Sequence, residues 1–434
     1  MSKLARQRLL KPYNFVGVFA ALDVGSSQIT CLVCYNNGRG DIQILGMGTR
    51  RAEGIQAGNV IDMGAAQKSI LNAVNLAEQL AGETVEEVML SVNCGRLNSR
   101  VIELELDVEN SQVSRHHLNS LHAYARSQDT LALEENDALA RLYTECFEYT
   151  LDGNNRVTNP VGMSADKIAA RIVAVSAPWH PLLTLVDCVE RCHLTVKEVV
   201  ASPIATGMGC LTPEERDAGV TLIDLGAGSA SLATYFRGSP IHVEVLQGAG
   251  DVLTSDLSAA LGCTLGEAER VKNLHGAAFV RPTDASHEFA LQTAGGATHH
   301  GQEHAHVTRA FVVDILQARL DEIFGRIANR LDHKDMLPYS SRRVVITGGG
   351  ANLVGLRDYA ALRLKRNVRL GRPSQLPGIG HMKTTPNQSN ALGLAHMLAQ
   401  RAKAGVEGIS ATQAKIYTET KSNGAFGAIR SMFA

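Results

Sequence analysis

Two short stretches of this chain place an aspartate, a glycine and hydroxyl residues in the same order after an apolar run. The first reads Leu22-Asp23-Val24-Gly25-Ser26-Ser27, and the second reads Ile223-Asp224-Leu225-Gly226-Ala227-Gly228-Ser229. Glycines let backbone N–H groups approach phosphate oxygens, and clustered N–H groups bind anions. Each aspartate supplies a hard oxygen of the kind that Mg²⁺ prefers, directly or through its waters. Two such turns facing each other would clamp a magnesium-bound phosphate.

A third segment, residues 342–351, reads as a strand that ends in Gly348-Gly349-Gly350 and leads into an apolar stretch typical of a helix. A nucleoside could lie there against bare backbone. One Asp-x-Gly is a weak signal, because most are ordinary turns. Two copies with the glycine triplet favour a nucleotide site, and no GxxxxGK[ST] motif competes with it. The alternative is three glycine-rich turns that close three core strands.

These motifs resemble the actin/Hsp70/sugar-kinase superfamily, and within it the chain resembles the FtsA family of bacterial cell-division proteins from about Val16 to about Gln400. Residues 159–164, 190–196 and, most closely, 248–257 carry this resemblance. It implies an α/β fold of duplicated, actin-like, ribonuclease-H-like domains with a central nucleotide cleft and an FtsA-type IC subdomain. It also implies ATP and Mg²⁺ as ligands, with Glu269 and Lys272 near the ribose or base. The expected nucleotide-binding residues are Asp23, Gly25, Ser26, Ser27, Asp224, Gly226, Gly228, Ser229, Gly250, Asp251, Glu269, Lys272, Gly348, Gly349 and Gly350, with Mg²⁺ on Asp23 and Asp224 through water.

The resemblance also implies a division of the chain into subdomains. Subdomain IIB would receive the C-terminal peptide of the tubulin-like protein FtsZ, IC would contact other division proteins, and the chain would form filaments with itself. The expected parts are 1–15, a basic tail; 16–90 with 178–215, subdomain IA; 91–177, IC; 216–263 with 334–400, IIA; 264–333, IIB; 401–423, a linker; and 424–434, an amphipathic membrane tail.

Bulk composition excludes several classes of protein. A length of 434 residues with 45% hydrophobic residues suits two or more globular domains. A net charge of −1 gives no overall field that favours nucleic acid. No apolar run reaches the roughly 18 residues that span a bilayer. Eight cysteines form no dense disulfide pattern, so a reduced cytosol fits best, and Cys31 and Cys34 read as buried thiols rather than metal ligands.

Periodicity predicts several elements. We expect a hairpin around Asn36-Asn37-Gly38, a helix over 62–80 with Leu80 in the core, and an alternating strand over 101–108. A long helix over 307–331 would bury Phe311 among other positions. We expect helical and loop-rich segments between that strand and 171, and a solvated His-rich loop over 281–306. Lys3, Arg6, Arg8 and Lys11 are typical of a disordered basic tail, and a contact with anionic lipid is the alternative, which the weak helical face of the nearby leucines disfavours.

Phe426, Ile429 and Phe433 fall on one helical face near the end of the printed sequence, with Met432 and Arg430 beside them. The FtsA family resembles this pattern, which implies a peripheral protein at the cytoplasmic face of the inner membrane, at the division septum. A few apolar side chains at roughly 1.5–3 kcal/mol each bind weakly alone, but many tails on a filament would bind by avidity. A frayed tail is the alternative.

Three positions depart from the pattern of superfamily members that hydrolyse ATP. Ser202, before Pro203, stands where they carry Glu or Gln to orient water, and Ser231 and Ala227 replace an Asp and a Gly of the second turn. We therefore expect ATP binding with slow or absent hydrolysis and assign no catalytic residue. The leading hypothesis is an actin-like division protein that polymerises on the membrane and anchors FtsZ. The alternatives are an actin-like scaffold for pilus assembly and a small-molecule kinase.

Overall fold

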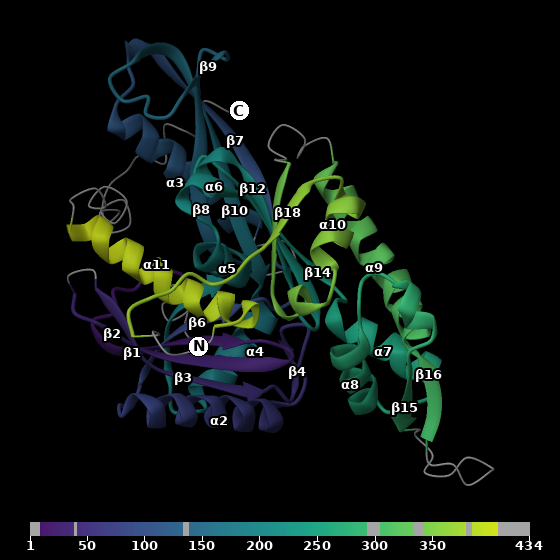
Figure 1. Ribbon diagram of the computed structural model, residues 1–434. Coiled ribbons are helices and arrows are strands. Elements are labelled where there is room, and N and C mark those ends of the chain that lie inside the picture. The colour runs from purple at the N-terminus through teal and green to yellow at the C-terminus, as the bar shows by residue number, and fades with distance from the viewer. Residues whose placement is uncertain are drawn as a thin grey trace.

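Two large β-sheets form the centre of the molecule (Figure 1). The computed structural model describes residues 9–38, 41–132, 139–292, 304–333, 342–378 and 384–406. In spatial order the first sheet contains β11 (Thr195–Ala201), β6 (Glu87–Val92), β1 (Gly17–Val24), β2 (Gln28–Asn36) and β3 (Ile42–Arg51). The second contains β18 (Asn367–Leu370), β17 (Arg343–Thr347), β12 (Val220–Leu225), β13 (Ser229–Phe236) and β14 (Ser239–Gln247), followed by β7 (Asn98–Gln112), β10 (Ser164–Pro178), β8 (Leu139–Leu151) and β9 (Asn155–Val157).

The two sheets repeat one topology. In the first sheet, β1, β2 and β3 form an antiparallel meander, and β6 and then β11 add in parallel on the other side of β1. In the second sheet, β12, β13 and β14 form the meander, and β17 and then β18 add in parallel on the other side of β12. The two aspartates occupy equivalent positions, because Asp23 lies opposite Ser91 and Asp224 lies opposite Thr347 in the parallel pairs. The chain therefore contains the same unit twice, as its duplicated motifs predict.

Helices cover the outer faces of the sheets and fill the space between them. The outer face of the first sheet packs on α2 (Met63–Ala81) and α4 (Trp179–Glu190). That of the second packs on α7 (Gly250–Leu261), α8 (Leu265–His275), α9 (Arg309–Leu331) and α10 (Leu356–Leu364). A shared core between the sheets contains α5 (Ser202–Cys210) and α11 (Ser389–Val406). The short elements are α6 (Pro213–Ala218), β4 (Ile55–Gln56), β5 (Asn59–Val60), η1 (Pro282–Ala285), β15 (Glu288–Gln292), β16 (His304–Thr308), η2 (Gly349–Asn352) and η3 (Pro386–Gln388).

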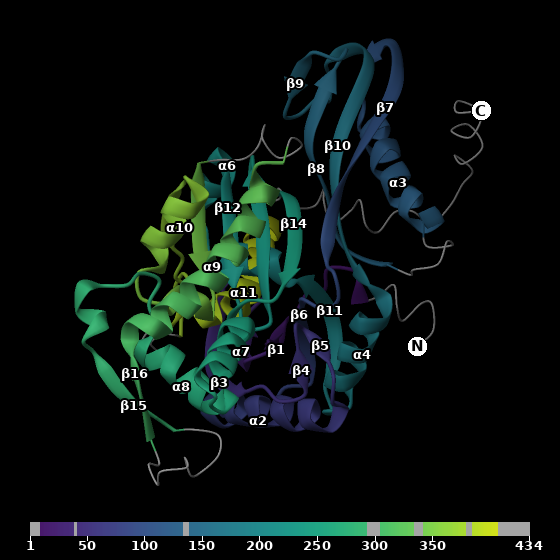
Figure 2. The same ribbon diagram turned by 90° about the vertical axis from the view of Figure 1, so that its right-hand side faces the viewer.

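The strands β7 to β10 are the far end of the second sheet. Together with α3 (Arg115–Ala132) they project from the rest of the molecule as an extension with its own core (Figure 2). The predicted alternation over 101–108 is confirmed: Val108 is buried in this core, and Val101, on the other face, is 42% exposed. Strand β7 pairs with β14 at Asn98 and Glu244, so the extension continues the second sheet.

Strand β8 contradicts the helical and loop-rich structure that we expected between 109 and 170. It lies between β10 and β9 and runs through the middle of the extension. Glu148 on this strand is only 3% exposed, and it lies near Arg156, Arg171 and Arg237 at 3.7–3.9 Å. Buried charges of this kind interrupt the apolar alternation from which a strand is recognised.

Other elements follow the prediction in existence but differ in detail. Asp62 caps α2 by accepting a hydrogen bond from the N–H of Ala65, but Leu80 is 55% exposed. Helix α9 buries Leu316 and Phe324, whereas Phe311 is 47% exposed, because an apolar spacing alone does not define the edge of the buried face. Part of the expected His-rich loop is a hairpin, since β15 pairs with β16. No group of three potential metal ligands occurs among the described residues.

The chain ends differ from the expected boundaries. The described part of the basic tail is ordered: Leu9 and Phe15 are buried, and the N–H of Tyr13 donates to Glu198 Oε2 at 2.9 Å. Helix α11 continues past Gln400 to Val406, and Arg401 pairs with the same buried Glu198 at 2.8 Å. The rest of the linker and the whole membrane tail lie outside the described residues. No helix of the described chain is long and apolar enough to cross a membrane.

The ion pair between Glu198 and Arg401 yields a stability prediction. Arg401→Met leaves a carboxylate that is 4% exposed without its guanidinium, so we expect the free energy of unfolding to fall by about 2–4 kcal/mol at neutral pH. Urea unfolding measures this change. The control is Arg357→Met, because Arg357 and Asp358 form an exposed pair whose loss costs about 0.5 kcal/mol or less. Equal losses in the two variants would show that the buried pair does not stabilise the chain ends.

Candidate functional site

The two Asp-x-Gly turns have the same backbone geometry. The N–H of Gly25 donates to the carbonyl of Gln28 at 3.1 Å, and the N–H of Gly226 donates to that of Ser229 at 3.0 Å. The first turn joins β1 to β2, and the second joins β12 to β13, so each aspartate comes two residues before the glycine of a tight reversal. The local sequence therefore builds one loop twice, at equivalent ends of the two sheets.

The folded chain brings these two turns against each other. A Cβ atom on Gly228 would lie 2.8 Å from Ser26 Oγ and 2.7 Å from the backbone of Ala57, so only glycine allows this approach. Ser26 Oγ also accepts a hydrogen bond from the N–H of Gly58, and Asn93 Nδ2 donates to Ser229 Oγ at 3.0 Å. The second turn thus contacts the first half of the molecule at several points.

The carboxylates of Asp23 and Asp224 repel each other where the two turns meet. Burial, and then the charge of Asp224, raises the pKa of Asp23 to about 7, although the hydrogen bond from Asn390 opposes the shift. Burial raises the pKa of Asp224 to about 6 against the opposing hydrogen bond from Thr206. A partly buried pair of like charges without a cation is an unfavourable arrangement that a bound metal ion relieves.

The oxygen atoms of the two carboxylates fit the requirements of Mg²⁺. Asp23 Oδ1 accepts from Asn390 Nδ2 at 2.8 Å, and Asp224 Oδ2 accepts from Thr206 Oγ1 at 3.2 Å. Within the described residues, the other oxygen of each carboxylate accepts no hydrogen bond, and neither aspartate forms an ion pair. This leaves one hard oxygen on each aspartate for a magnesium ion or its waters.

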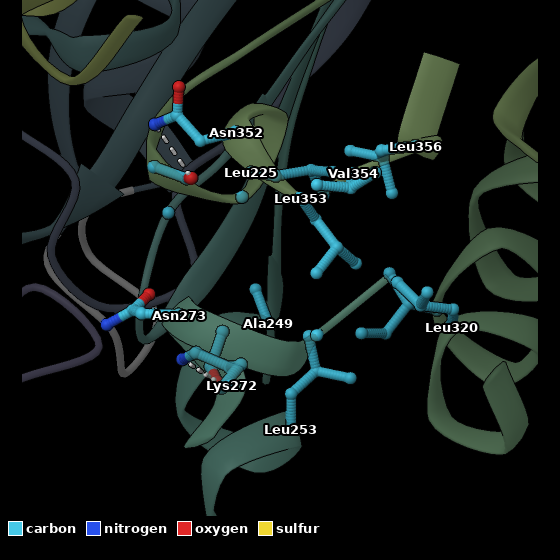
Figure 3. A pocket seen from close by; sticks show the side chains of 16 residues that line it. Leu225, Ala249, Leu253, Lys272, Asn273, Leu320, Asn352, Leu353, Val354 and Leu356 are labelled. Atoms are coloured by element: carbon cyan, nitrogen blue, oxygen red, sulfur yellow. Dashed lines mark hydrogen bonds between the residues drawn. The ribbon is translucent and has the colours of Figure 1, made fainter. Parts of the chain in front are cut away.

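A pocket opens beside the second turn, between β12, α7, α8, α9 and the glycine triplet (Figure 3). Its polar side holds Lys272, Asn273 and Asn352, and the opposite side is apolar, with Leu253 and Leu320 among its residues. The predicted residues that line it are Gly226, Gly250, Lys272, Gly349 and Gly350. This mixture of bare backbone, leucine side chains and a few amides suits a flat nucleoside.

Gly348 shows why the triplet is needed here. Its φ of 84° lies in the region that favours glycine, and an added Cβ would lie 2.2 Å from Asp224 Oδ1. The chain can therefore turn from β17 into η2 directly beside the carboxylate. The sequence interpretation of this segment as a strand that ends in glycines is confirmed.

Lys272 ties α8 to α7 at the edge of the pocket. Its Nζ donates to the carbonyl of Gly250 at 3.2 Å and to Thr254 Oγ1 at 2.6 Å, and it pairs with Glu269 Oε2 at 2.6 Å. Glu269 contacts Lys272 but does not line the pocket. Asp251 does not line it either, and its N–H donates to the carbonyl of Ala227, which fixes the start of α7 on the second turn.

Several residues at the site were not anticipated from the sequence. They are Thr206, Asn273, Asn352 and Asn390, which hydrogen-bond to a predicted residue or line the pocket. Asn273 directly follows Lys272, so the resemblance at 268–272 could have extended to it. Thr206 and Asn390 lie far from both turns in sequence, and only the packing of α5 and α11 brings them there.

Solved structures with this arrangement define the class of protein. The PilM-PilN type IV pilus biogenesis complex has a TM-score of 0.63 and 15% identity, covering 89% of this chain and 99% of that chain. MreB5 of Spiroplasma citri bound to ADP has a TM-score of 0.52 and 13% identity, covering 90% and 98%. These similarities show the fold alone. It is the actin-like α/β fold, with duplicated ribonuclease-H-like domains around a central cleft, as the sequence predicts.

Sequence comparisons then identify the family. The family model described as cell division protein FtsA matches residues 221–393. The cell division protein FtsA of Rhizobium meliloti (strain 1021) is 30% identical over 387 residues, which cover 87% of this chain and 86% of that protein. FtsA of Escherichia coli (strain K12) is 26% identical over 382 residues, which cover 86% and 89%. The chain belongs to the FtsA family of bacterial cell-division proteins, and the resemblance seen in its motifs is confirmed.

The repulsion between the two aspartates yields a pH-dependent prediction. The pKa of Asp23 is about 7 in the folded protein, whereas an unfolded Asp has a pKa near 4. Between these two pH values the folded state holds the proton more tightly, so the protein loses stability as the pH rises from 4 towards 7. We expect Asp23→Asn to raise the free energy of unfolding by roughly 1–3 kcal/mol at pH 8 without Mg²⁺ or nucleotide. The difference in free energy of unfolding between Asp23→Asn and the wild type should vanish near pH 4. Urea unfolding across this pH range measures it.

The control for this series is Asp358→Asn, which alters a carboxylate on the surface. Its stability should follow that of the wild type at every pH. A variant Asp23→Asn that is less stable than the wild type at pH 8 would show that the two carboxylates do not repel each other in the folded state.

Proposed function

We propose that this protein binds Mg–ATP in the cleft between its two halves and acts as an actin-like scaffold in cell division. The observation that carries this proposal is the contact between two equivalent Asp-x-Gly turns, each with one free carboxylate oxygen, the second of which lies beside a glycine-lined pocket. Membership of the FtsA family supports the role in division. The structure of a relative in fold, MreB5, with ADP supports a nucleotide as the ligand.

Each part of the site has a distinct role in this proposal. The turns at Gly25 to Ser27 and at Gly226 to Ser229 present N–H and hydroxyl groups to the phosphates. Asp23 and Asp224 hold Mg²⁺ through water, and the ion neutralises phosphate charge when bound. Gly349 and Gly350 line the nucleoside side, where Lys272 and Glu269 close the edge. Gly250 and Asp251 fix the second turn to α7.

The residue at the start of α5 supports binding without fast hydrolysis. Ser202 is buried, and its hydroxyl accepts a hydrogen bond from Asn390 Nδ2 at 2.7 Å. A serine engaged in this way is a poor substitute for the Glu or Gln that orients an attacking water. We therefore infer that ATP holds the two halves together and that turnover is slow or absent.

This inference predicts a low rate of phosphate release. With ATP, Mg²⁺ and FtsZ present, we expect turnover at least about 100-fold below the 1–100 s⁻¹ typical of kinases. A coupled phosphate assay measures the rate, with Asp224→Asn as the background. Turnover at a kinase-like rate that Asp224→Asn abolishes would refute the inference and favour the kinase alternative.

The finer roles follow from the family. We propose that the chain polymerises at the cytoplasmic face of the inner membrane at the division septum. Subdomain IIB, about 264–333, would bind the C-terminal peptide of FtsZ, and IC, about 91–177, would contact other division proteins. Phe426, Ile429, Arg430, Met432 and Phe433 would attach the chain to lipid as a peripheral protein. Co-sedimentation with FtsZ, ATP and lipid vesicles tests these roles together, and FtsZ that stays in the supernatant would refute the anchor.

The tail yields its own prediction. Deletion of 424–434 removes the apolar face, so we expect flotation with anionic vesicles to be lost. Phe433→Glu should reduce flotation about as strongly, because it places a charge on that face. Ser431→Glu adds the same charge on the opposite side of the helix and is the matched control. Equal flotation of the deletion variant and the wild type would refute the lipid anchor.

The pilus-scaffold alternative is favoured by one observation, the TM-score of 0.63 with the PilM-PilN complex. The flotation experiment separates the two functions. A scaffold held at the membrane by a protein partner does not bind vesicles by itself, whereas the proposed division protein does.

A further inference from the structure

Asn390 is a buried amide at the start of α11 whose hydrogen-bonding groups are all engaged. Its Nδ2 donates to Asp23 Oδ1 at 2.8 Å and to Ser202 Oγ at 2.7 Å. Its Oδ1 accepts from Ser91 Oγ at 2.9 Å. A flipped amide would place its oxygen against the carboxylate of Asp23, so these contacts allow one orientation only.

The residue before Asn390 makes the equivalent contact in the other half. Ser389 Oγ lies 2.8 Å from Thr347 Oγ1, and Thr347 stands beside Asp224 just as Ser91 stands beside Asp23. Two consecutive side chains of α11 therefore reach the two halves of the molecule at matching positions, one beside each carboxylate.

Helices α5 and α11 each donate a hydrogen bond to the aspartate of the opposite half of the molecule. Thr206 on α5, which follows the first sheet, donates to Asp224 in the second, whereas Asn390 on α11, which follows the second sheet, donates to Asp23 in the first. The helices pack too closely to slide past each other, since a Cβ on Gly393 would lie 1.8 Å from the carbonyl oxygen of Ala205. Each half thus supplies the donor that holds the carboxylate of the other half.

We propose that Asn390 is a positioning residue that couples Mg–nucleotide binding to the relative placement of the two halves. It holds Asp23 Oδ1, which leaves Oδ2 for the ion, and it keeps the carboxylate from turning towards Ser202. Because the amide belongs to the second half, Asp23 is correctly placed only when α11 sits against β1 and β6. The inference rests on the proposed function, since it names a residue that acts at the same nucleotide site.

The test compares the affinity for ATP in excess Mg²⁺ with the affinity in EDTA, both by calorimetry on the full chain. The dissociation constant in EDTA divided by that in Mg²⁺ measures how strongly the ion contributes to ATP binding. We expect Asn390→Ala to lower this ratio about tenfold or more, as the loss of a hydrogen bond to a charged group does. The affinity in EDTA should change about twofold or less, because the nucleoside pocket is untouched.

Asn36→Ala is the matched control. Asn36 is also a buried asparagine, whose Nδ2 donates to the carbonyl of Phe15 and whose Oδ1 accepts from the N–H of Gly38, away from the cleft. This variant should lose thermal stability much as Asn390→Ala does but keep the wild-type ratio. A residue that is merely structural would change stability without changing the ratio.

Asn390→Asp is the second variant, isosteric with the wild type, so that it opens no cavity in the core. It replaces the donor with a third carboxylate, and we expect the ratio to fall at least as far as in Asn390→Ala. Wild-type ratios in both variants would overturn the inference and leave the proposed function intact. A wild-type chain that binds no ATP, or binds it equally with and without Mg²⁺, would overturn the proposed site and the inference with it.

Discussion

Two carboxylates of like charge, Asp23 and Asp224, lie close together at the floor of one cleft, and this repulsion is the constraint on which the site depends. Burial and the neighbouring charge raise the pKa of Asp23 to about 7, which means that the free protein holds this arrangement at a cost. Cores are not built this way unless another interaction depends on the charges. In the function that we propose, a cation between the two free oxygens would turn the repulsion into attraction, so that ligand and closure would stabilise each other.

The duplicated topology explains how such a pair can be maintained. Both aspartates occupy the same register position, beside a hydroxyl residue on the parallel neighbour. Neither sheet alone can bring them together, because each contains one copy. The close contact of Gly228 with Ser26 and the packing of Gly393 on Ala205 fix the two copies face to face. The glycines of this chain are thus as important for the shape of the cleft as for contact with a phosphate.

Local pattern was sufficient to predict the repeated unit but not its assembly. The Asp-x-Gly turns, the glycine triplet and the hairpin around Asn37 follow from residue types within a few positions, and all are found where expected. Asn390 and Thr206 could not be predicted in this way, because their role arises from tertiary contacts that bring α11 to Asp23 and α5 to Asp224. Strand β8 was missed for a related reason: its buried Glu148 is stabilised by arginines from other strands and loops, which a local window does not contain.

The contacts of Ser202 agree with the proposed binding of ATP without fast hydrolysis. Hydrolysis needs a side chain that is free to orient water, whereas a stable closed cleft needs every polar group near the ion to be held. At the start of α5 the polar group is held rather than free, since the Ser202 hydroxyl accepts a hydrogen bond from the same amide that holds Asp23. A residue that oriented water at this position would compete for Asn390 and loosen the carboxylate. For the scaffold that we propose, whose filament contacts would depend on a fixed angle between its halves, persistent closure is the more useful property, and a buried serine is consistent with it.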